Sequence, residues 1–218
     1  MTRTRRPQFV AHRFQLRPED VTVVDGLPVT SLARTWRDLA DVLSLADLVA
    51  AADCALRAGA TVDELAEAIA RGSRRRRTRV ARAALGLADA RSRSRPESHL
   101  RVAISAPGLP RFGVNEPVHR DEGGWLAEPD LSLPEAKLAL EYQGDDHAKV
   151  GRMRKDLSRF ADLRINGWLV LPYGPAEVFG RPWTVLAEVR NEIRTRAPHL
   201  LTPTRRSSSG HLGLRVVS

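Results

Sequence analysis

The sequence predicts an α/β fold with a mixed α+β sheet, preceded by a small, mainly helical region. Three observations carry this prediction. Apolar residues recur at helical spacing between capping signals over residues 32–72. Two apolar–polar alternating runs within residues 125–143 are separated by a Pro-containing turn, as in a β-hairpin. The apolar run 168–171 lies between two helical patterns, as expected of a buried strand.

The first region, residues 1–70, begins with an irregular basic stretch and then becomes helical. Thr30 or Ser31 suits the N-cap of the first helix, and Thr61 to Glu64 form a capping box for the third. The expected elements are a strand-like run Val21–Val24 closed by the Asp25-Gly26 turn, then helices from Leu32 to about Leu43, from Ser44 to about Gly59, and from Thr61 to about Gly72.

An arginine-rich segment, residues 71–95, follows this region. It holds ten arginines and one acid, Asp89, and we interpret it as a charged linker at a domain boundary. Val80–Leu87 within it could form a helix. A run of four arginines suits non-specific phosphate contacts, although a solvated linker explains the run as well. These candidate nucleic-acid-binding residues are Arg74, Arg75, Arg76 and Arg77.

The next region, residues 96–196, has a mixed pattern. Ser94 to Glu97 form a second capping box, which opens a helix. The expected elements are this helix to about Ala106, strands near Val114–His119, Trp125–Leu133 and Lys137–Gln143, a helix from about Val150 to Asn166, a strand Trp168–Leu171, and a helix from about Pro182 to Arg194. Residues 197–218 are expected to be a disordered tail.

Composition restricts the classes of protein. The net charge is +9, and arginine supplies 32 of the 35 basic residues, which favours a polyanion partner over a basic protein without one. No apolar run approaches the roughly 20 residues of a membrane span, and the basic N-terminus lacks the apolar stretch of a signal peptide. A single cysteine, Cys54, excludes an internal disulfide framework and a multi-cysteine zinc site, so a cytoplasmic location is expected.

The hairpin carries the candidate chemistry. If its centre lies between Glu135 and Ala136, the numbers of directly opposed residues sum to 271. One face is then apolar, and the other places Asp130 opposite Glu141 and Glu128 opposite Gln143. Opposed carboxylates repel unless a positive charge lies between them, and oxygen ligands of this kind suit Mg²⁺. The alternative is a solvated polar face on an edge hairpin.

These residues resemble a known nuclease signature. Pro129-Asp130, ten residues and then Glu141-Tyr142-Gln143 resemble the PD-(D/E)XK motif, with Gln in the position usually held by Lys. Glu141 to His147, with the later Lys155-Asp156-Leu157-Ser158-Arg159 and Gly167-Trp168, resemble a domain-of-unknown-function family related to the very-short-patch-repair (Vsr-like) endonucleases. The resemblance covers roughly residues 94–195 and implies a restriction-endonuclease-like α-β-β-β-α-β core.

The resemblance implies a metal-dependent DNA endonuclease, in repair or defence. Asp130 and Glu141 would hold Mg²⁺ (or Mn²⁺), and Gln143 would contact water or phosphate. His147 would act as general acid or base, and Glu97 would orient water or join the metal shell, although a capping role explains Glu97 equally well. The implied catalytic set is therefore Asp130, Glu141, Gln143, Glu97 and His147.

A second resemblance covers about residues 9–58. Val29-Thr30-Ser31-Leu32-Ala33-Arg34-Thr35-Trp36-Arg37-Asp38-Leu39-Ala40 resembles a segment of AbiEi-like antitoxins of type IV toxin–antitoxin systems. Those proteins usually begin with a DNA-binding winged helix, and we expect this chain to start after that domain. The resemblance implies an alternative, a non-catalytic DNA-binding or antitoxin-type regulator that keeps a nuclease fold. A partner encoded in a toxin–antitoxin or defence locus is a third possibility.

Overall fold

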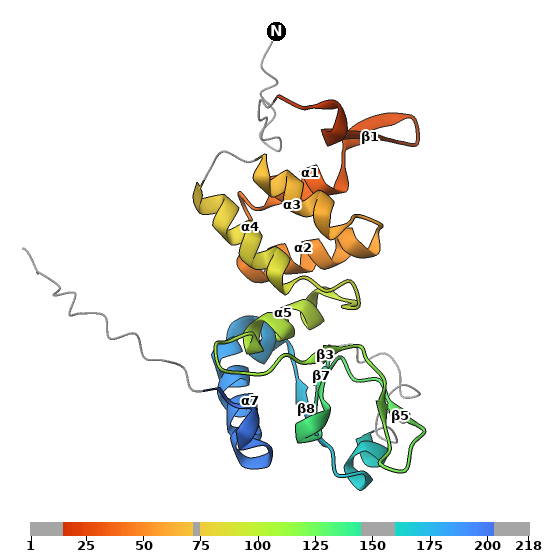
Figure 1. Ribbon diagram of the computed structural model, residues 1–218, viewed down its shortest axis with the longest axis vertical. Coiled ribbons are helices and arrows are strands. Elements are labelled where there is room, and N and C mark those ends of the chain that lie inside the picture. Colours follow the sequence, from red (N-terminus) through yellow and green to blue (C-terminus); the bar gives the residue numbers. More distant parts are fainter. Residues whose placement is uncertain (1–14, 72–74, 145–159, 203–218) are drawn as a thin grey trace, which may run out of the picture. The chain divides into compact units, whose positions relative to one another are not determined.

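The computed structural model describes residues 15–71, 75–144 and 160–202. The chain divides into two compact units, residues 1–90 and 91–218, and each is treated by itself below (Figure 1). The mixture of helices with a mixed sheet confirms the predicted α/β class. In the described ranges no helix is both long enough and apolar enough to cross a lipid bilayer.

The first unit is a short hairpin followed by four packed helices. Helix α1 packs on α2 and α3, and α4 packs on α2 and α3. The N-caps expected at Ser31 and Thr61 are confirmed, and Ser44, where the second helix was expected to begin, also caps its helix, because each accepts a backbone N–H from the first turn. The elements are η1 Pro18–Asp20, β1 Val21–Val24, β2 Leu27–Thr30, α1 Leu32–Leu39, α2 Leu45–Arg57, α3 Val62–Ala70 and α4 Arg75–Leu87.

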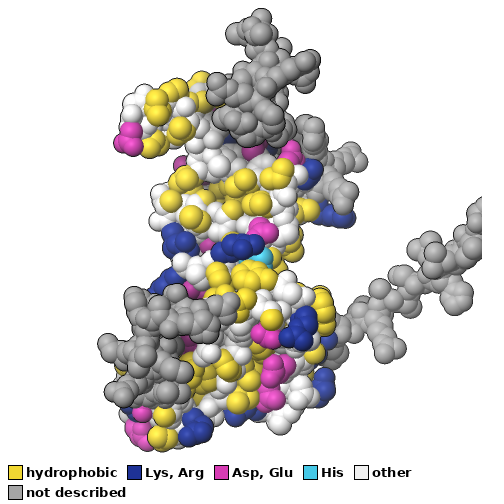
Figure 2. Space-filling view, turned by 180° about the vertical axis from the view of Figure 1, so that it is seen from behind, with side chains coloured by type: hydrophobic (Ala, Val, Ile, Leu, Met, Phe, Trp, Pro, Cys, Tyr) yellow, Lys and Arg dark blue, Asp and Glu magenta, His cyan; other side chains and the backbone are white. Residues whose placement is uncertain are grey.

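Trp36 is the centre of this unit's core. Its side chain is 1% exposed, and its indole N–H donates to the Leu48 carbonyl at 2.9 Å, which ties α1 to α2. The β1–β2 hairpin, in contrast, presents apolar side chains to solvent. Val23 and Leu27 are each about two-thirds exposed, and Figure 2 shows this hairpin covered largely by hydrophobic side chains.

Helix α4 revises the interpretation of residues 71–95 as a linker. It begins at Arg75, five residues before the helix expected at Val80. Its Ala81 and Ala84 are fully buried, because the arginines alternate with small apolar residues at helical spacing. Residues 75–87 of the arginine-rich segment are therefore a helix that packs on α2 and α3.

The second unit contains a four-stranded sheet in the order β3-β6-β7-β8. The first two pairings are antiparallel and the β7–β8 pairing is parallel, while β4 and β5 form a separate antiparallel pair. Residues 160–165 are helical. The elements are α5 Arg95–Ile104, β3 Gly113–Val114, β4 Val118–His119, β5 Trp125–Ala127, β6 Leu131–Leu133, η2 Pro134–Ala136, β7 Leu138–Tyr142, β8 Leu169–Tyr173, η3 Ala176–Gly180, α7 Pro182–Arg196 and η4 Pro198–Leu200.

Each face of the sheet has its own core. On one face, Leu131 and Leu140 pack with Leu100 of α5 and with Val189 of α7. On the other face, Ala139 packs with the β4–β5 pair and with the segment from Phe160 to Trp168. The sheet therefore lies between two layers, and its central strands have no solvent-exposed face.

Three expectations about this unit were wrong. Trp125–Leu133 is not one strand but two, in different sheets, because Pro129 has no N–H to donate to a ladder. The strand expected over Val114–His119 is likewise divided between β3 and β4. Residues 197–202 are ordered rather than part of a tail, since Ala197 is completely buried in the core beside α7.

Candidate functional site

The register of the β6–β7 hairpin follows the predicted sum. Leu131 pairs with Leu140, Ser132 with Ala139 and Leu133 with Leu138. The turn between the strands is the 3₁₀ segment η2, followed by Lys137 in the left-handed conformation at φ 45°. The next position of this register places Asp130 beside Glu141, as the sequence predicted.

Of the two predicted metal ligands, Asp130 lies directly before β6 and contacts the strand β7, which carries Glu141. The Tyr142 backbone N–H donates to Asp130 Oδ2 at 2.8 Å, so the carboxylate of Asp130 reaches across to β7. The Asn115 backbone N–H donates to the Asp130 carbonyl at 3.0 Å and holds the residue from its other side. Backbone groups on two neighbouring strands thus fix the position of Asp130.

Glu141 is more deeply buried than it would be on an edge hairpin. It is 4% exposed, and the neighbouring Ser132 is 1% exposed, because β6 and β7 are the interior strands of the sheet. The alternative of a solvated polar face is therefore wrong for these two positions. A buried carboxylate loses its hydration, and positive charge or hydrogen bonds must compensate for that loss.

Glu97 does not complete the predicted capping box. Ser94 caps helix α5 by accepting the Glu97 backbone N–H, but Glu97 Oε2 accepts the backbone N–H of Arg93 at 2.7 Å instead of that of Ser94. The same oxygen accepts Asn115 Nδ2 at 2.8 Å. Since Asn115 also holds the Asp130 carbonyl, Glu97 is connected to Asp130 through one intervening residue.

Asn115 is the site residue that sequence reasoning missed. Its side chain also donates to the Arg91 carbonyl at 2.9 Å, and it is only 9% exposed. Its backbone has φ 47°, a left-handed conformation that asparagine tolerates better than most residues. An asparagine directly after the apolar Gly113-Val114 pair is the signal that could have identified it.

Two further acids lie next to this network. Glu128, predicted opposite Gln143, instead forms an ion pair with Arg93, because the strand is interrupted at Pro129. Glu116, which follows Asn115, forms an ion pair with Arg91. Both pairs are partly exposed, so they contribute little stability and are easily exchanged for other partners.

Of the remaining predicted catalytic residues, the structure describes Gln143 but not His147. Gln143 is exposed just beyond β7, and its backbone N–H donates to the Tyr173 carbonyl at 2.8 Å, which extends the β7–β8 pairing by one bond. His147 lies outside the described residues, as do Lys155, Asp156 and Arg159 of the same motif. The structure therefore says nothing of a general base at His147.

The donor set at Asp130 and Glu141 fits a divalent metal of the Mg²⁺ type. Both offer carboxylate oxygens, and an ionised carboxylate has about four lone-pair positions, so the bond from Tyr142 orients Asp130 without exhausting its capacity. Among the described residues there is no group of three or more potential metal ligands. Two protein carboxylates suffice for Mg²⁺, which usually keeps several waters and binds substrate phosphate.

The four predicted nucleic-acid-binding arginines are only partly accounted for. Arg77 donates to the carbonyls of Ala40 and Asp41 and pairs with the Asp41 carboxylate at 3.2 Å, so it joins α4 to the end of α1. Arg74 lies outside the described residues, and so do the side chains of Arg75 and Arg76. Of the four, the described Arg77 has a structural role within the first unit.

An aromatic cluster adjoins the end of β7. The Phe179 ring lies edge-on to His99 at a centroid distance of 4.9 Å and to Tyr142 at 6.4 Å. The Arg95 guanidinium lies 5.0 Å from the Phe179 centroid, within cation–π range. The contact joins the helix α5 to η3, about 80 residues away in the sequence.

Comparison with known proteins yields only uncharacterized relatives. The chain is 31% identical over 172 residues to uncharacterized proteins from two strains of Mycobacterium tuberculosis, a match that covers 78% of this chain. The aligned part is 63% of the length of those relatives. No family model matches the chain. No solved structure matches it either.

Proposed function

We propose that the second unit is a restriction-endonuclease-like core and that the chain is a metal-dependent DNA endonuclease of the Vsr-like PD-(D/E)XK type. One observation carries the proposal: Asp130, directly before β6, accepts the Tyr142 N–H of β7, the interior strand that also carries the buried Glu141. The order α5, β3, β6, β7, a helical segment at 160–165 and β8 supports it.

In this proposal the residues have separate tasks. Asp130 and Glu141 hold Mg²⁺ or Mn²⁺, which when bound polarises the scissile phosphate and lowers the pKa of an attacking water. Glu97 is a positioning residue, because it acts on Asp130 through Asn115. The exposed Gln143 amide contacts phosphate or water, and His147 exchanges a proton with the reacting water or the leaving group. The net charge of +9 favours DNA as the polyanion.

The test is cleavage of supercoiled plasmid and of mismatched duplex with Mg²⁺, Mn²⁺ or EDTA. Asp130→Asn and Glu141→Gln keep the size of each side chain and remove its charge. Each should lower cleavage by more than about 100-fold, because loss of an outer-shell partner alone costs up to that much. Glu135→Gln is the matched control, since Glu135 is an exposed acid at the turn of the same hairpin. Full activity in both site variants would refute the assignment.

A second function has its own support. Gln143 is neutral where the nuclease signature usually has Lys, and the Val29–Ala40 segment resembles antitoxins. Both features favour a DNA-binding or antitoxin-type regulator that lacks nuclease chemistry. Binding of DNA that is salt-sensitive but equal in Mg²⁺ and EDTA, without any cleavage by the wild type, would select this function.

A further inference from the structure

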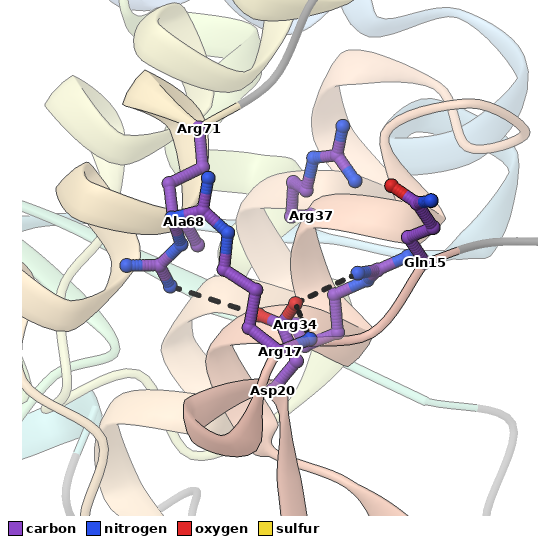
Figure 3. Close-up of a pocket in the computed structure, with 7 residues that line it drawn as sticks. All are labelled: Gln15, Arg17, Asp20, Arg34, Arg37, Ala68 and Arg71. Carbon is purple, nitrogen blue, oxygen red and sulfur yellow. Dashed lines mark hydrogen bonds and ion pairs between the residues drawn. The ribbon is translucent and has the colours of Figure 1, made fainter.

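A second candidate site lies in the first unit, away from the carboxylates discussed above. A pocket of about 350 Å³ is lined by residues from the segment before η1, from α1 and from the end of α3 (Figure 3). This volume is within the range of small-molecule sites. Its lining residues are Gln15, Arg17, Asp20, Arg34, Arg37, Ala68 and Arg71.

Four arginines and one aspartate give the pocket lining a formal charge of +3. Asp20 is the central acid, and Figure 3 shows its contacts with Arg17, Arg34 and Arg71, while Arg37 has no dashed line to it. Its Oδ2 accepts Arg34 Nη1 at 3.0 Å and the Arg17 backbone N–H at 3.2 Å, and its Oδ1 lies 3.8 Å from Arg71 Nη2. Asp20 therefore contacts three of the four arginines that line the pocket.

Among the four arginines of the pocket, Arg34 has a structural role. It is 5% exposed, and its Nε donates to Asp38 at 2.8 Å while its Nη1 donates to Asp20. Arg34 and Asp38 are both part of the antitoxin-like motif. The ion pair between them explains two charged positions of that motif. Arg34 neutralises Asp20, which leaves the other three arginines as the pocket's surplus positive charge.

Those three arginines have partners that are easily displaced. Arg71 pairs with Glu67 at 3.4 Å, but Glu67 is 72% exposed, and Arg17 lies 3.8 Å from Glu19 with both side chains more than half exposed. Arg37 pairs with its chain neighbour Asp38 at 3.2 Å. The Arg17–Glu19 pair and the exposed Glu67 partner of Arg71 contribute about 0–1 kcal/mol each, and Asp38 is shared between Arg37 and Arg34, so a dianion in the pocket can compete for these arginines.

We infer that this pocket binds a phosphate group through Arg17, Arg37 and Arg71, with Asp20 and Arg34 as its rigid base. Planar guanidinium groups match the geometry of phosphate oxygens and bind them with two parallel hydrogen bonds. The pocket's volume leaves room for a group attached to the phosphate. The phosphate belongs either to a small molecule such as a nucleotide or to the backbone of DNA, and the experiment below separates these sources.

The experiment titrates the full chain with inorganic phosphate, adenosine monophosphate and a short DNA duplex, all in EDTA. Chelation prevents metal-dependent cutting, so the result does not depend on the proposed nuclease activity. Arg37→Gln and Arg71→Gln are the test variants, and both keep the two residues of the Asp20–Arg34 hydrogen bond. Each should weaken binding about tenfold, the loss expected for one charge-assisted hydrogen bond. Arg82→Gln, at an exposed position on α4, is the control and should bind as the wild type does.

Each outcome is decisive. Binding of phosphate or the nucleotide that both variants weaken supports a small-molecule phosphate site. Duplex binding that both variants weaken, without binding of the small probes, supports a DNA-backbone phosphate. If no probe binds, or if Arg82→Gln weakens binding as much as Arg37→Gln does, the inference is overturned. Circular dichroism of each variant checks that the helices are retained.

Discussion

The buried pair of Asp20 and Arg34 predicts how the first unit responds to the substitution Asp20→Asn. Asp20 is 5% exposed and accepts hydrogen bonds from Arg34 and from the Arg17 backbone. Asparagine keeps the shape and one acceptor oxygen but removes the negative charge. The Arg34 guanidinium, itself buried, would then be neutralised by Asp38 alone.

Removal of one partner from a buried ion pair typically costs about 3–5 kcal/mol. The cost here should be smaller, because Asp38 still binds Arg34 at 2.8 Å and asparagine can still accept one hydrogen bond. We therefore expect the free energy of unfolding of the first unit to fall by about 2 kcal/mol.

The loss of stability in Asp20→Asn should become smaller at low pH. Burial raises the pKa of Asp20, but the Arg17 N–H, the Arg34 hydrogen bond and the charges of Arg34 and Arg71 outweigh it and hold the pKa below the ordinary value of 3.8. A lowered folded-state pKa gives stability that is present above 3.8 and is lost as the pH falls through the folded-state value. The difference in the free energy of unfolding between wild type and Asp20→Asn should therefore be largest at about pH 6 and should decrease below pH 3.8.

Hydrogen exchange of amides in α1 and α2 as a function of urea measures this free energy for the first unit alone. The matched control is Asp25→Asn at the exposed tip of the β1–β2 hairpin, where φ is 50° and asparagine is equally tolerated. A difference below about 0.5 kcal/mol, or one that does not change with pH, would refute the reasoning, because both would mean that the Asp20 charge is not used in folding.

Three other predictions follow from single buried groups. Ser132 Oγ is buried without a hydrogen-bond partner among the described residues. In urea unfolding, Ser132→Ala should therefore leave the free energy of unfolding unchanged or raise it by up to about 1 kcal/mol. A decrease of more than about 1 kcal/mol would contradict this prediction. Trp36→Phe should lower the stability of the first unit by about 2 kcal/mol, since it removes the bond to Leu48 and leaves a cavity; unchanged hydrogen exchange would contradict it. Burial and the Glu188 carboxylate raise the pKa of Tyr173 above its ordinary value of 10.0, so in a Tyr142→Phe variant the 295 nm absorbance should stay flat through that pH until the protein unfolds. Ionisation at about pH 10 in the folded variant would refute the last prediction.

Local signals predicted the elements well where the physics is local. Ser31, Ser44 and Thr61 cap the helices that follow them, because a cap is a contact between residues only three apart. The β6–β7 register could be predicted residue by residue, because the side-chain alternation of a hairpin and its turn length leave one arrangement that buries the leucines. The same argument failed at Glu128, where Pro129 ends the ladder.

Long-range contacts could not be predicted in this way. The bond from Asn115 to Glu97 and the Phe179–His99 contact depend on how the helix α5 lies against the sheet and on the turn after β8. The Arg34–Asp20 pair joins α1 to a turn 14 residues earlier. Alternation and capping patterns contain no information on such contacts, because many partners at that separation satisfy the same local rules.

The sequence by itself determined the α/β class, the starts of the first three helices, and the register of the β6–β7 hairpin. These follow from backbone periodicity and from contacts within a few residues. Only the tertiary structure decided that this hairpin lies in the interior of a sheet and not at its edge, that Glu97 bonds to Arg93 and Asn115, and that Arg34 of α1 and Arg71, directly after α3, both reach Asp20. The reason is that burial and charge pairing are set by which elements pack together, and that packing minimises the exposed apolar area of a whole unit.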